Sequence, residues 1–443
     1  MDQIRRGGSV PYQAVHSATD EVLLGFGFGR PKMTHNTNVA LKCSGIIGSE
    51  FALAAPSFVP TKLFFGLGSS AAFADILADV MLEQGGRKIL LLTGAPGEKK
   101  NWMETFESAV GGFDHIVVRN TVSNPTLGSV SEVLEIARAA GVDTVVAVGG
   151  GSVLDTGKAV AALARSDLSI EDAIAQKSVS DIPLNYLAVP TTSGTGSEVT
   201  SYATIWDDKA KAKYSLSTPA MYPMIALIDP SLGASMPQEI AAGTGLDALS
   251  HAMESCWSIN STDESIELGL AAIELVIENL ETAVLNPENE RALADISLAS
   301  LYAGMSIAQG QTTISHAISY PLTARYGIHH GHACGASVGS LLRFNDQVSP
   351  EDCQDVRGYQ HVRSVLDRII DALSATDAAS AERRILDLMG RIGLRTFDQF
   401  HEVDLALLAE DVIGYDRFGN NPRRMSADQL VEFLGSLGVA KHV

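Results

Sequence analysis

The chain has 443 residues, 46% of them hydrophobic, so it can bury more than one core and two or three domains are expected. Lys and Arg total 32 against 52 Asp and Glu, and the net charge of -20 would repel nucleic acid and anionic membrane surfaces. These numbers disfavour both kinds of partner.

The four cysteines lie far apart and form no CxxC pair, which fits neither a disulfide framework nor a zinc ribbon. No apolar run is long enough to span a bilayer, and the first thirty residues lack the pattern of an export signal. We therefore expect a cytoplasmic protein without a membrane segment. The cysteines are Cys43, Cys256, Cys334 and Cys353.

The sequence pattern divides the chain into three predicted segments. Residues 1–58 show no clear period, and we interpret them as an N-terminal extension around one or two strands. Over residues 59–230, short β runs such as KILLLTG and DTVVAVGGG alternate with helical stretches such as AAFADILADVMLEQ, which predicts a parallel α/β sheet built from βαβ units. Over residues 231–443, long amphipathic stretches such as SIELGLAAIELVIENLETAV predict an all-α domain.

A glycine-rich turn in VVAVGGGSVLDTGK joins a buried strand to a helix start. Its glycines would let the backbone approach a pyrophosphate, and the helix N-terminus offers free N–H groups to an anion. The same turn could be only a tight connection. The candidate cofactor-binding residues here are Gly149, Gly150, Gly151, Ser152 and Asp155.

A second polar turn, PTTSGTGSEVT, also follows a strand. Its hydroxyls could hold a cofactor phosphate or ribose, or they could satisfy the backbone of their own loop. The presence of two such turns supports a cofactor-binding site more strongly than one turn would. The candidates here are Thr191, Thr192, Thr195 and Ser197.

Neither turn is the dinucleotide fingerprint G-x-G-x-x-G. The turn after KILLLT carries Gly94 where an acidic residue would bind the ribose 2′-hydroxyl and repel a 2′-phosphate. Because that repulsion is missing, NADPH is at least as plausible a cofactor as NADH.

A carboxylate and several imidazoles form a candidate metal site. Asp247 and His251 are four residues apart and share one face of a helix. One Asp with three His suits Fe(II), Zn(II), Mn(II), Co(II) or Ni(II) better than Ca(II) or Mg(II). Each histidine alone would more often be structural. The residue types leave open which of His329, His330 and His332 faces a metal. The further candidates are His316, His329, His330 and His332.

These segments resemble the iron-containing (group III) alcohol dehydrogenases, from about Pro60 to the Asn420-Asn421-Pro422-Arg423 stretch. The shared motifs are GGGSVLDTGK, PTTSGTGSEVT, GLDALSHAME and HAISYPLTARYGIHHG. The resemblance implies a Rossmann-like nucleotide-binding domain followed by an all-α metal-binding domain of the dehydroquinate synthase-like kind.

The resemblance also implies roles for individual residues. The glycine-rich turn and the Thr191–Thr195 turn would bind NADPH or NADH, and the metal would be Fe(II), with Zn(II) or Mn(II) as alternatives. The spacing of the family motif singles out His330 among its neighbours. The implied metal ligands, which are also catalytic, are Asp247, His251, His316 and His330.

Three residues depart from the common pattern of this family. Tyr320 stands where most members have a second histidine, His329 where a proline commonly precedes the last ligand, and Gly94 where many NAD-preferring members carry Asp. Tyr320 is a candidate catalytic residue, since its hydroxyl could supply the proton for the product alcohol, as could His329, the cofactor ribose or bulk water.

The implied reaction is hydride transfer between a nicotinamide and a small aldehyde or its primary alcohol. The stretch HAISYPLTARYGIHHGHACG is similar to members that reduce phosphonoacetaldehyde to 2-hydroxyethylphosphonate in phosphonate biosynthesis. The alternative substrates are maleylacetate, lactaldehyde or a general alcohol. Two other classes stay open: a dehydroquinate synthase-like lyase, which the Asp-plus-three-His set disfavours, and a non-catalytic nucleotide-binding protein.

A phosphonate substrate would need local cations in this acidic chain. We also expect a homodimer, the commonest arrangement of soluble oligomers. The candidate phosphonate clamp residues, each of which would more often be a solvated surface charge, are Lys209, Arg325, Arg343 and Arg424.

Overall fold

The computed structural model describes residues 51–94, 102–119, 124–395 and 403–438. All of them belong to one compact unit, Val39–Val443. Most of the predicted extension over residues 1–58 lies outside the described residues.

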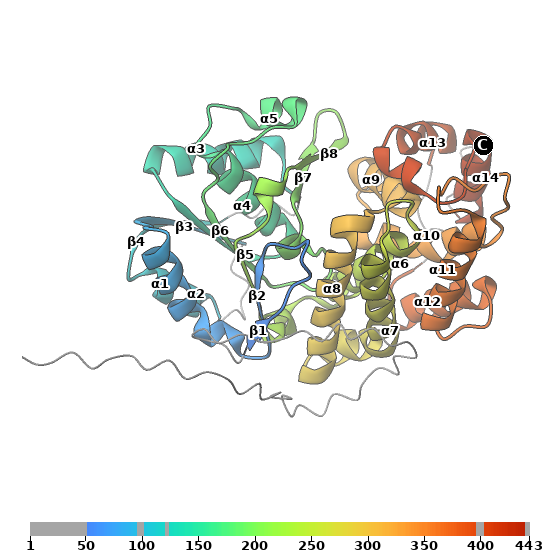
Figure 1. The fold of residues 1–443 in the computed structure, drawn as a ribbon, viewed down its shortest axis with the longest axis horizontal. Coiled ribbons are helices and arrows are strands. Elements are labelled where there is room, and N and C mark those ends of the chain that lie inside the picture. The colour runs from blue at the N-terminus through green and yellow to red at the C-terminus, as the bar shows by residue number, and fades with distance from the viewer. Residues whose placement is uncertain (1–50, 95–101, 120–123, 396–402, 439–443) are drawn as a thin grey trace, which may run out of the picture. The chain divides into compact units, whose positions relative to one another are not determined.

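The first half of the described chain is built on a seven-stranded sheet with the order β1-β2-β9-β6-β5-β3-β4 (Figure 1). Only the β1–β2 pairing is antiparallel, and every other neighbouring pair in this sheet is parallel. The predicted parallel α/β architecture is therefore confirmed. In sheet order the strands are Ala52–Leu53, Lys62–Phe65, Ile225–Ile228, Asn185–Pro190, Thr144–Gly149, Lys88–Thr93 and Asp114–Arg119.

Helices cover both faces of the sheet, so its central strands are apolar without alternation. In β3, Ile89 and Leu91 pack with residues of α1 and α2, whereas Leu90 and Leu92 pack with residues of α3 and α4. Each central strand thus contributes to two cores. The helices of this half are α1 (Phe73–Glu83), α2 (Met103–Val110), α3 (Leu127–Ala140), α4 (Gly151–Leu163) and α5 (Ile170–Gln176).

A separate antiparallel hairpin, β7 (Tyr202–Asp207) and β8 (Ala212–Ser217), was not predicted from the sequence. Its turn is closed by the Asp207 carboxylate, which accepts from the backbone N–H groups of Lys209 and Ala210. Many of its residues are polar or charged, so it lacks the apolar run that marks the strands of the sheet. One strand of the hairpin, β8, contacts α9 in the second half.

All the named elements among the described residues of the second half are helices, which confirms the predicted all-α architecture. None of the described helices is long and apolar enough to cross a membrane. The predicted boundary near residue 231 stays a prediction. The helices are α6 (Gln238–Trp257), α7 (Asp263–Leu285), α8 (Glu290–Gly310), α9 (Ile314–Tyr326), α10 (His330–Asp346), α11 (Tyr359–Ala372), α12 (Ala378–Arg391), α13 (Leu405–Ile413) and α14 (Ala427–Ser436).

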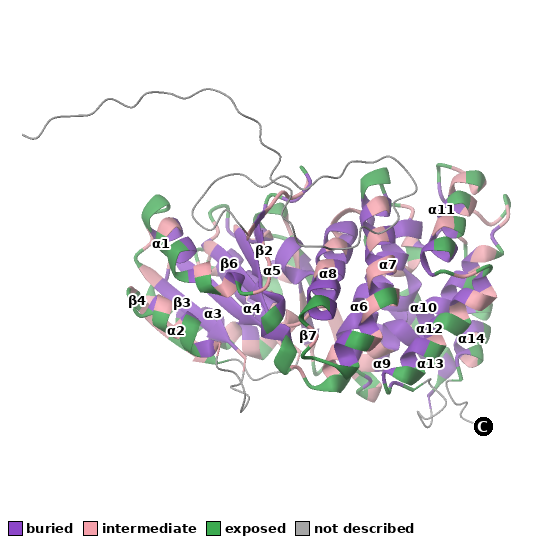
Figure 2. Cartoon of the chain, turned by 90° about the horizontal axis from the view of Figure 1, so that it is seen from below, coloured by how far each residue is buried: buried purple, intermediate pink, exposed green. Residues whose placement is uncertain are grey.

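Helix α6 forms the centre of this half, and every residue from Ala242 to Trp257 is buried (Figure 2). A helix that is buried on all sides normally carries apolar residues on all sides. Three of these buried residues instead carry a carboxylate or an imidazole: Asp247, His251 and Glu254. Buried groups of this kind need polar partners, which neighbouring elements must supply.

The two halves touch through backbone at Gly196, in the second polar turn, and Gly304, on α8. Gly196 has a positive φ of 62°, and a Cβ atom added there would lie 2.3 Å from the Gly304 Cα. Only glycine tolerates both the left-handed conformation and this approach.

We predict that Gly196→Ala lowers the free energy of unfolding by about 2–4 kcal/mol, since it adds both strain and overlap. Urea denaturation followed by circular dichroism measures the effect. Gly390→Ala is the matched control, because a Cβ at Gly390 in α12 meets no atom of the described residues within 4 Å. Equal urea midpoints for the two variants would contradict this account.

Candidate metal and cofactor site

The four predicted metal ligands come together in the helical half. The Asp247 Oδ1 atom lies 3.9 Å from the Nε2 atom of His251, 3.5 Å from that of His316 and 3.6 Å from that of His330. Asp247 and His251 lie on α6, His316 on α9 and His330 at the start of α10. A single carboxylate oxygen therefore faces three imidazole nitrogens.

Close contact between α6 and α10 brings His330 into this cluster. A Cβ atom added at Gly331 would lie 2.1 Å from the Gly243 carbonyl oxygen and 2.9 Å from the Asp247 Cβ, so only glycine fits there. His329 instead lies against Gly243, and His332 makes its hydrogen bond to the Arg395 carbonyl at 2.5 Å. Of the three neighbouring histidines, His330 is the one that meets Asp247.

The residues fit a metal ion. Asp247 Oδ1 and His316 Nε2 are buried and have no hydrogen-bond partner within the described part of the chain. Leaving such atoms unpaired in the interior costs free energy, and a shared cation would serve as a partner for both. One carboxylate oxygen with three imidazole nitrogens is a ligand set for a first-row transition metal.

Each of the three imidazoles is held through its other nitrogen. Nδ1 of His251 lies 3.1 Å from the Gly194 carbonyl oxygen, and Nδ1 of His330 lies 3.0 Å from the Ser319 hydroxyl. Nδ1 of His316 contacts the Glu254 carboxylate. A proton on Nδ1 that donates to these oxygens leaves the Nε2 lone pair available to a metal. We therefore assign the Nδ1–H tautomer to all three rings.

Glu254 is a functional residue that sequence reasoning missed, although it stands in the GLDALSHAME motif. Its side chain is fully buried, and its Oε1 atom accepts from the Thr313 N–H at 3.1 Å, the Thr313 hydroxyl at 2.5 Å and the Ser315 N–H at 2.8 Å. Its Oε2 atom contacts His316. Glu254 thus ties the first turn of α9 to α6 and orients His316. Its position seven residues after Asp247, on the same helix face, was the available signal.

The protonation states of His251, His330 and Asp247 suit metal binding, whereas His316 would have to give up a proton to a metal. Burial lowers the pKa of His251 to about 4 and that of His330 to about 3, so both rings are neutral at pH 7. Burial alone would raise the pKa of Asp247, but the surrounding imidazoles outweigh it and hold this pKa below its usual range. Burial also opposes protonation of His316, but the acidic groups of Cys334, Glu254 and Asp247 raise its pKa.

Two further side chains border the cluster. Cys334, also missed from the sequence, has its Sγ atom 3.9 Å from His330 Nε2. It belongs with Asp247, His316 and His330 to a group whose ligand atoms lie within 4.8 Å of one another, a group that does not include His251. Burial raises the pKa of the Cys334 thiol, and a neutral thiol is a poorer metal ligand than an imidazole. The Tyr320 ring lies where expected and stacks on His330, with ring centroids 5.8 Å apart and an angle of 7°. Tyr320 also meets the ring of Tyr415 edge-on at 4.9 Å.

The two polar turns, identified separately in the sequence, lie against each other. A Cβ atom at Gly150 would lie 3.2 Å from the Thr192 side chain, and one at Gly151 would lie 2.6 Å from that of Thr195. The Thr191 N–H donates to the Gly149 carbonyl at 2.9 Å. Because α4 begins at Gly151, its free N–H groups open next to the threonine hydroxyls.

Helix α4 also braces the second turn. The Ser197 hydroxyl donates to Asp155 at 2.6 Å, and the Thr204 N–H donates to the same carboxylate at 2.7 Å. The buried Lys158 ammonium donates to the carbonyls of Ser197 at 2.7 Å and Tyr202 at 2.8 Å. Asp155 and Ser197 therefore bind each other, and their expected contact with a cofactor stays a prediction.

Gly94 directly follows β3 at the same edge of the sheet as the glycine-rich turn, since β3 and β5 are parallel neighbours. Among the described residues, a Cβ atom at Gly94 would meet only the Val153 side chain, at an ordinary 3.7 Å. The rest of the predicted turn, residues 95–97, lies outside the described residues.

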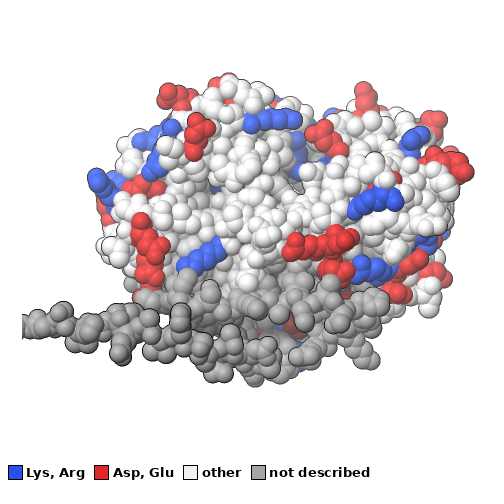
Figure 3. Space-filling model, viewed as in Figure 1, with Lys and Arg blue, Asp and Glu red and all other residues white. Residues whose placement is uncertain are grey.

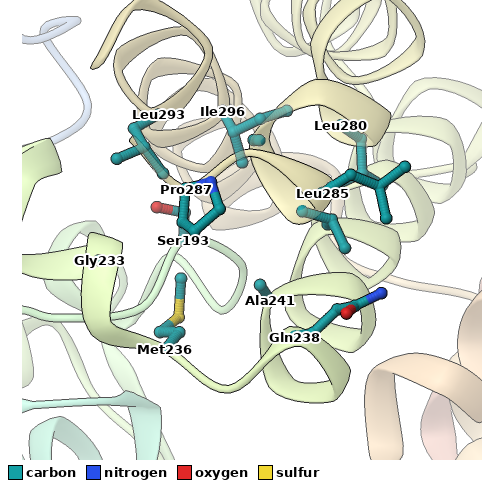
Figure 4. A pocket seen from close by; sticks show the side chains of 12 residues that line it. Ser193, Gly233, Met236, Gln238, Ala241, Leu280, Leu285, Pro287, Leu293 and Ile296 are labelled. Carbon is teal, nitrogen blue, oxygen red and sulfur yellow. The ribbon is translucent and has the colours of Figure 1, made fainter. Parts of the chain in front are cut away.

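A cavity of about 170 Å³ lies beside the second turn but apart from the four-residue cluster (Figure 4). Ser193 lines it on the turn side, and Leu280, Leu293 and Ile296 line it on the helical side. This lining is mostly apolar and carries no metal-ligand set.

The four candidate phosphonate clamp residues either form ion pairs with other groups or are exposed. Arg325 pairs with Asp411 at 2.7 Å and Arg343 with Glu382 at 2.8 Å. Lys209 and Arg424 are exposed. The contacts of the described residues join none of the four to the histidine cluster, and Figure 3 shows basic and acidic side chains interspersed on the face that it displays.

Comparison with known proteins places this architecture in a family. Residues 60–230 match the iron-containing alcohol dehydrogenases, and residues 241–437 match the C-terminal part of the same family. The phosphonoacetaldehyde reductase of Streptomyces viridochromogenes is 39% identical over 342 residues, which cover 75% of this chain and 86% of the relative.

Two sulfoacetaldehyde reductases are also similar. The enzyme of Bilophila wadsworthia is 31% identical over 383 residues, which cover 84% of this chain and 96% of the relative. The crystal structure of the enzyme from Bifidobacterium kashiwanohense in complex with NAD+ superimposes with a TM-score of 0.74 at 30% identity, covering 86% of this chain and 97% of that one. The family matches over both halves and these likenesses show that the chain belongs to the iron-containing alcohol dehydrogenase family and is an oxidoreductase.

Proposed function

We propose that the protein is a metal-dependent reductase that uses NADH or NADPH to convert a small aldehyde into its primary alcohol. The observation that carries the proposal is the meeting of Asp247 Oδ1 with three imidazole Nε2 atoms. The contact of His251 with the Gly194 carbonyl joins this cluster directly to the second polar turn. A metal site and a cofactor site would thus share one wall.

The metal ligands would be Asp247, His251, His316 and His330, with Fe(II) as the ion and Zn(II) or Mn(II) as alternatives. A bound ion supplies Lewis-acid polarisation of the carbonyl oxygen. Glu254, Gly194 and Ser319 hold the three rings so that their Nε2 atoms face one point. Preorganisation of this kind lowers the cost of placing the substrate oxygen there.

The cofactor would lie along the two polar turns. The glycines and the α4 N-terminus would bind the pyrophosphate, and the hydroxyls of Thr191, Thr192 and Thr195 would bind phosphate or ribose oxygens. A nicotinamide cofactor held there would supply the hydride for reduction of the carbonyl.

Tyr320 would supply the proton that completes the alcohol. Its ring stacks on His330, which places a buried hydroxyl-bearing side chain beside the cluster. Burial raises the pKa of the Tyr320 hydroxyl, but the positive charges of Lys213, His316 and Arg417 outweigh burial and lower it overall. A lowered pKa makes the hydroxyl a better donor to an alkoxide.

The substrate that we propose is phosphonoacetaldehyde, reduced to 2-hydroxyethylphosphonate in phosphonate biosynthesis. The 39% identical phosphonoacetaldehyde reductase supports this choice. A general alcohol dehydrogenase activity is the alternative, since relatives at lower identity include a methanol dehydrogenase and a 1,3-propanediol dehydrogenase. The homodimer and the cytoplasmic location stay predictions.

We predict that His316→Ala abolishes metal binding and lowers aldehyde reduction at least about a hundredfold, because Lewis-acid polarisation is worth several kcal/mol. Elemental analysis and the absorbance of NADH measure the two effects, and fluorescence titration should show that the cofactor still binds. His332→Ala is the control, since His332 lies two residues after a proposed ligand and bonds away from the cluster. Unchanged metal content and turnover in His316→Ala would refute the ligand assignment.

We predict that Glu254→Gln weakens metal binding about 10–100-fold while the fold is kept. The Gln carbonyl would accept the three bonds now made to Oε1, so its amide N–H would face His316 Nδ1 and force the ring to carry its proton on Nε2 instead. Titration of the metal-free variant with Co(II) measures the affinity. Glu239→Gln, an exposed change on the same helix, should have no effect, and equal affinities for the two variants would count against the tautomer argument.

We predict that Gly94→Asp shifts the cofactor preference toward NADH by at least about tenfold in the ratio of kcat/KM values, because a carboxylate there would repel a 2′-phosphate. The open surroundings of Gly94 should accept the side chain. Gly94→Asn has the same size without the charge and serves as the control. A ratio that moves equally in both variants would show that size, not charge, is responsible.

A further inference from the structure

Lys213 lies beside Tyr320, and Arg417 lies on a short 3-10 helix that packs against α9, the helix of Tyr320. The Lys213 ammonium lies 4.0 Å from the centroid of the Tyr320 ring and 3.1 Å from the Ser215 hydroxyl. Arg417 belongs to the short 3-10 helix Asp416–Asn420 and donates to Gln311 at 2.5 Å. Lys213 comes from β8, and both elements contact α9, the helix that carries Tyr320.

Neither side chain forms an ion pair among the described residues, although the chain has a net charge of -20. Two nearby acidic groups already bind other partners. Asp155 accepts from Ser197 and Thr204, and Asp411 pairs with Arg325. Lys213 and Arg417 are both only partly exposed, so their charges act in a setting that screens them less than bulk water does.

Both charges lie near the reaction site. The Tyr320 ring contacts the Lys213 ammonium and stacks on His330, so one aromatic ring separates this cation from a proposed metal ligand. Lys213 also acts electrostatically on His330, and Arg417 acts on Tyr320 and Tyr202. Two cations from elements that both pack against α9 can converge on a single small anion.

The surrounding residues hold the two cations in place. Tyr415 packs its ring edge-on against Tyr320 at 4.9 Å and interacts with the backbone of Lys213, which links the segment before Arg417 to the hairpin. Arg417 and Asn420 both donate to Gln311 at the end of α8. The positive patch is therefore built from the hairpin, α9 and the 3-10 helix, and does not consist of two isolated surface charges.

We propose that Lys213 and Arg417 form an anion-binding subsite that holds the tetrahedral group, phosphonate or sulfonate, of a short aldehyde whose carbonyl faces the histidine cluster. The inference rests on the proposed function and names the substrate class for that same site. It replaces the four clamp residues expected from the sequence. The guanidinium of Arg417 can donate two parallel hydrogen bonds to such a group, and the Lys213 ammonium adds a second charge. A neutral aldehyde would gain nothing from either.

The test compares Lys213→Gln and Arg417→Gln with the control variants Lys209→Gln, on the same hairpin but exposed, and Arg343→Gln, paired with Glu382. Each metal-loaded enzyme is assayed with phosphonoacetaldehyde, sulfoacetaldehyde and butanal. We expect the kcat/KM ratio of phosphonoacetaldehyde to butanal to fall about 10–100-fold in the first two variants, as for the loss of a hydrogen bond to a charged group. The control variants should keep the wild-type ratio.

Inhibition of butanal reduction by ethylphosphonate and by ethanesulfonate gives a second readout that needs no anionic aldehyde. Both variants should raise the inhibition constant, and Lys213→Arg and Arg417→Lys should restore part of the affinity. The anion that binds the wild type more tightly identifies the natural group. Melting temperatures check that each variant is folded.

The inference is overturned if the ratio is unchanged, or if butanal and phosphonoacetaldehyde lose activity equally, since the two cations would then serve Tyr320 and not the substrate anion. A wild-type enzyme that reduces butanal but gains nothing from an anionic group would refute the subsite and phosphonoacetaldehyde as the substrate, and would leave the proposed metal-dependent aldehyde reduction intact. A metal-loaded enzyme that reduces no aldehyde would refute the proposed function, and ethylphosphonate binding by calorimetry would still decide whether the subsite exists.

Discussion

The structure depends on one buried carboxylate, Asp247, which faces three imidazole nitrogens at the centre of the helical half. A charged group inside a helix that is buried on all sides is stable only if other elements bring partners to it. Helices α9 and α10 bring those partners, and the contact of Gly331 with α6 lets His330 come close enough. Helices α6, α9 and α10 therefore pack around a buried carboxylate that needs polar partners. The Asp247 Oδ1 and His316 Nε2 atoms have no hydrogen-bond partner among the described residues and are suitable ligands for a cation.

The need for polar partners at this buried cluster also connects the two halves of the chain. His251 is held by the carbonyl of Gly194, which lies in the polar turn after β6, and that turn is in turn braced by Asp155 and Lys158 of α4. The helix N-terminus that would receive a pyrophosphate is the start of this same α4. A change in the conformation of this turn would therefore alter both the proposed cofactor site and the proposed metal ligands. Hydride transfer to a polarised carbonyl needs these two sites in a fixed relative position.

Local sequence patterns were sufficient for the sheet and for part of the site. Alternation of apolar runs with helical stretches predicted the parallel sheet, and the i, i+4 spacing of Asp247 and His251 predicted their shared face. Residues whose role comes from long-range packing were missed. Glu254 has no local signal other than its helix face, and Lys213 lies in a hairpin without an apolar run. Likewise, Arg325 pairs with Asp411 and Arg343 pairs with Glu382, and in both pairs the partner is far away in the sequence.

The central claim is that one metal ion binds between Asp247, His251, His316 and His330. Anomalous scattering from crystals of the Fe(II)-loaded protein, measured on both sides of the iron absorption edge, tests it most directly. The account predicts a single strong anomalous peak within about 2.0–2.2 Å of the Asp247 carboxylate and the three Nε2 atoms. A peak elsewhere in the protein, or iron bound by fewer than three of these side chains, would contradict it.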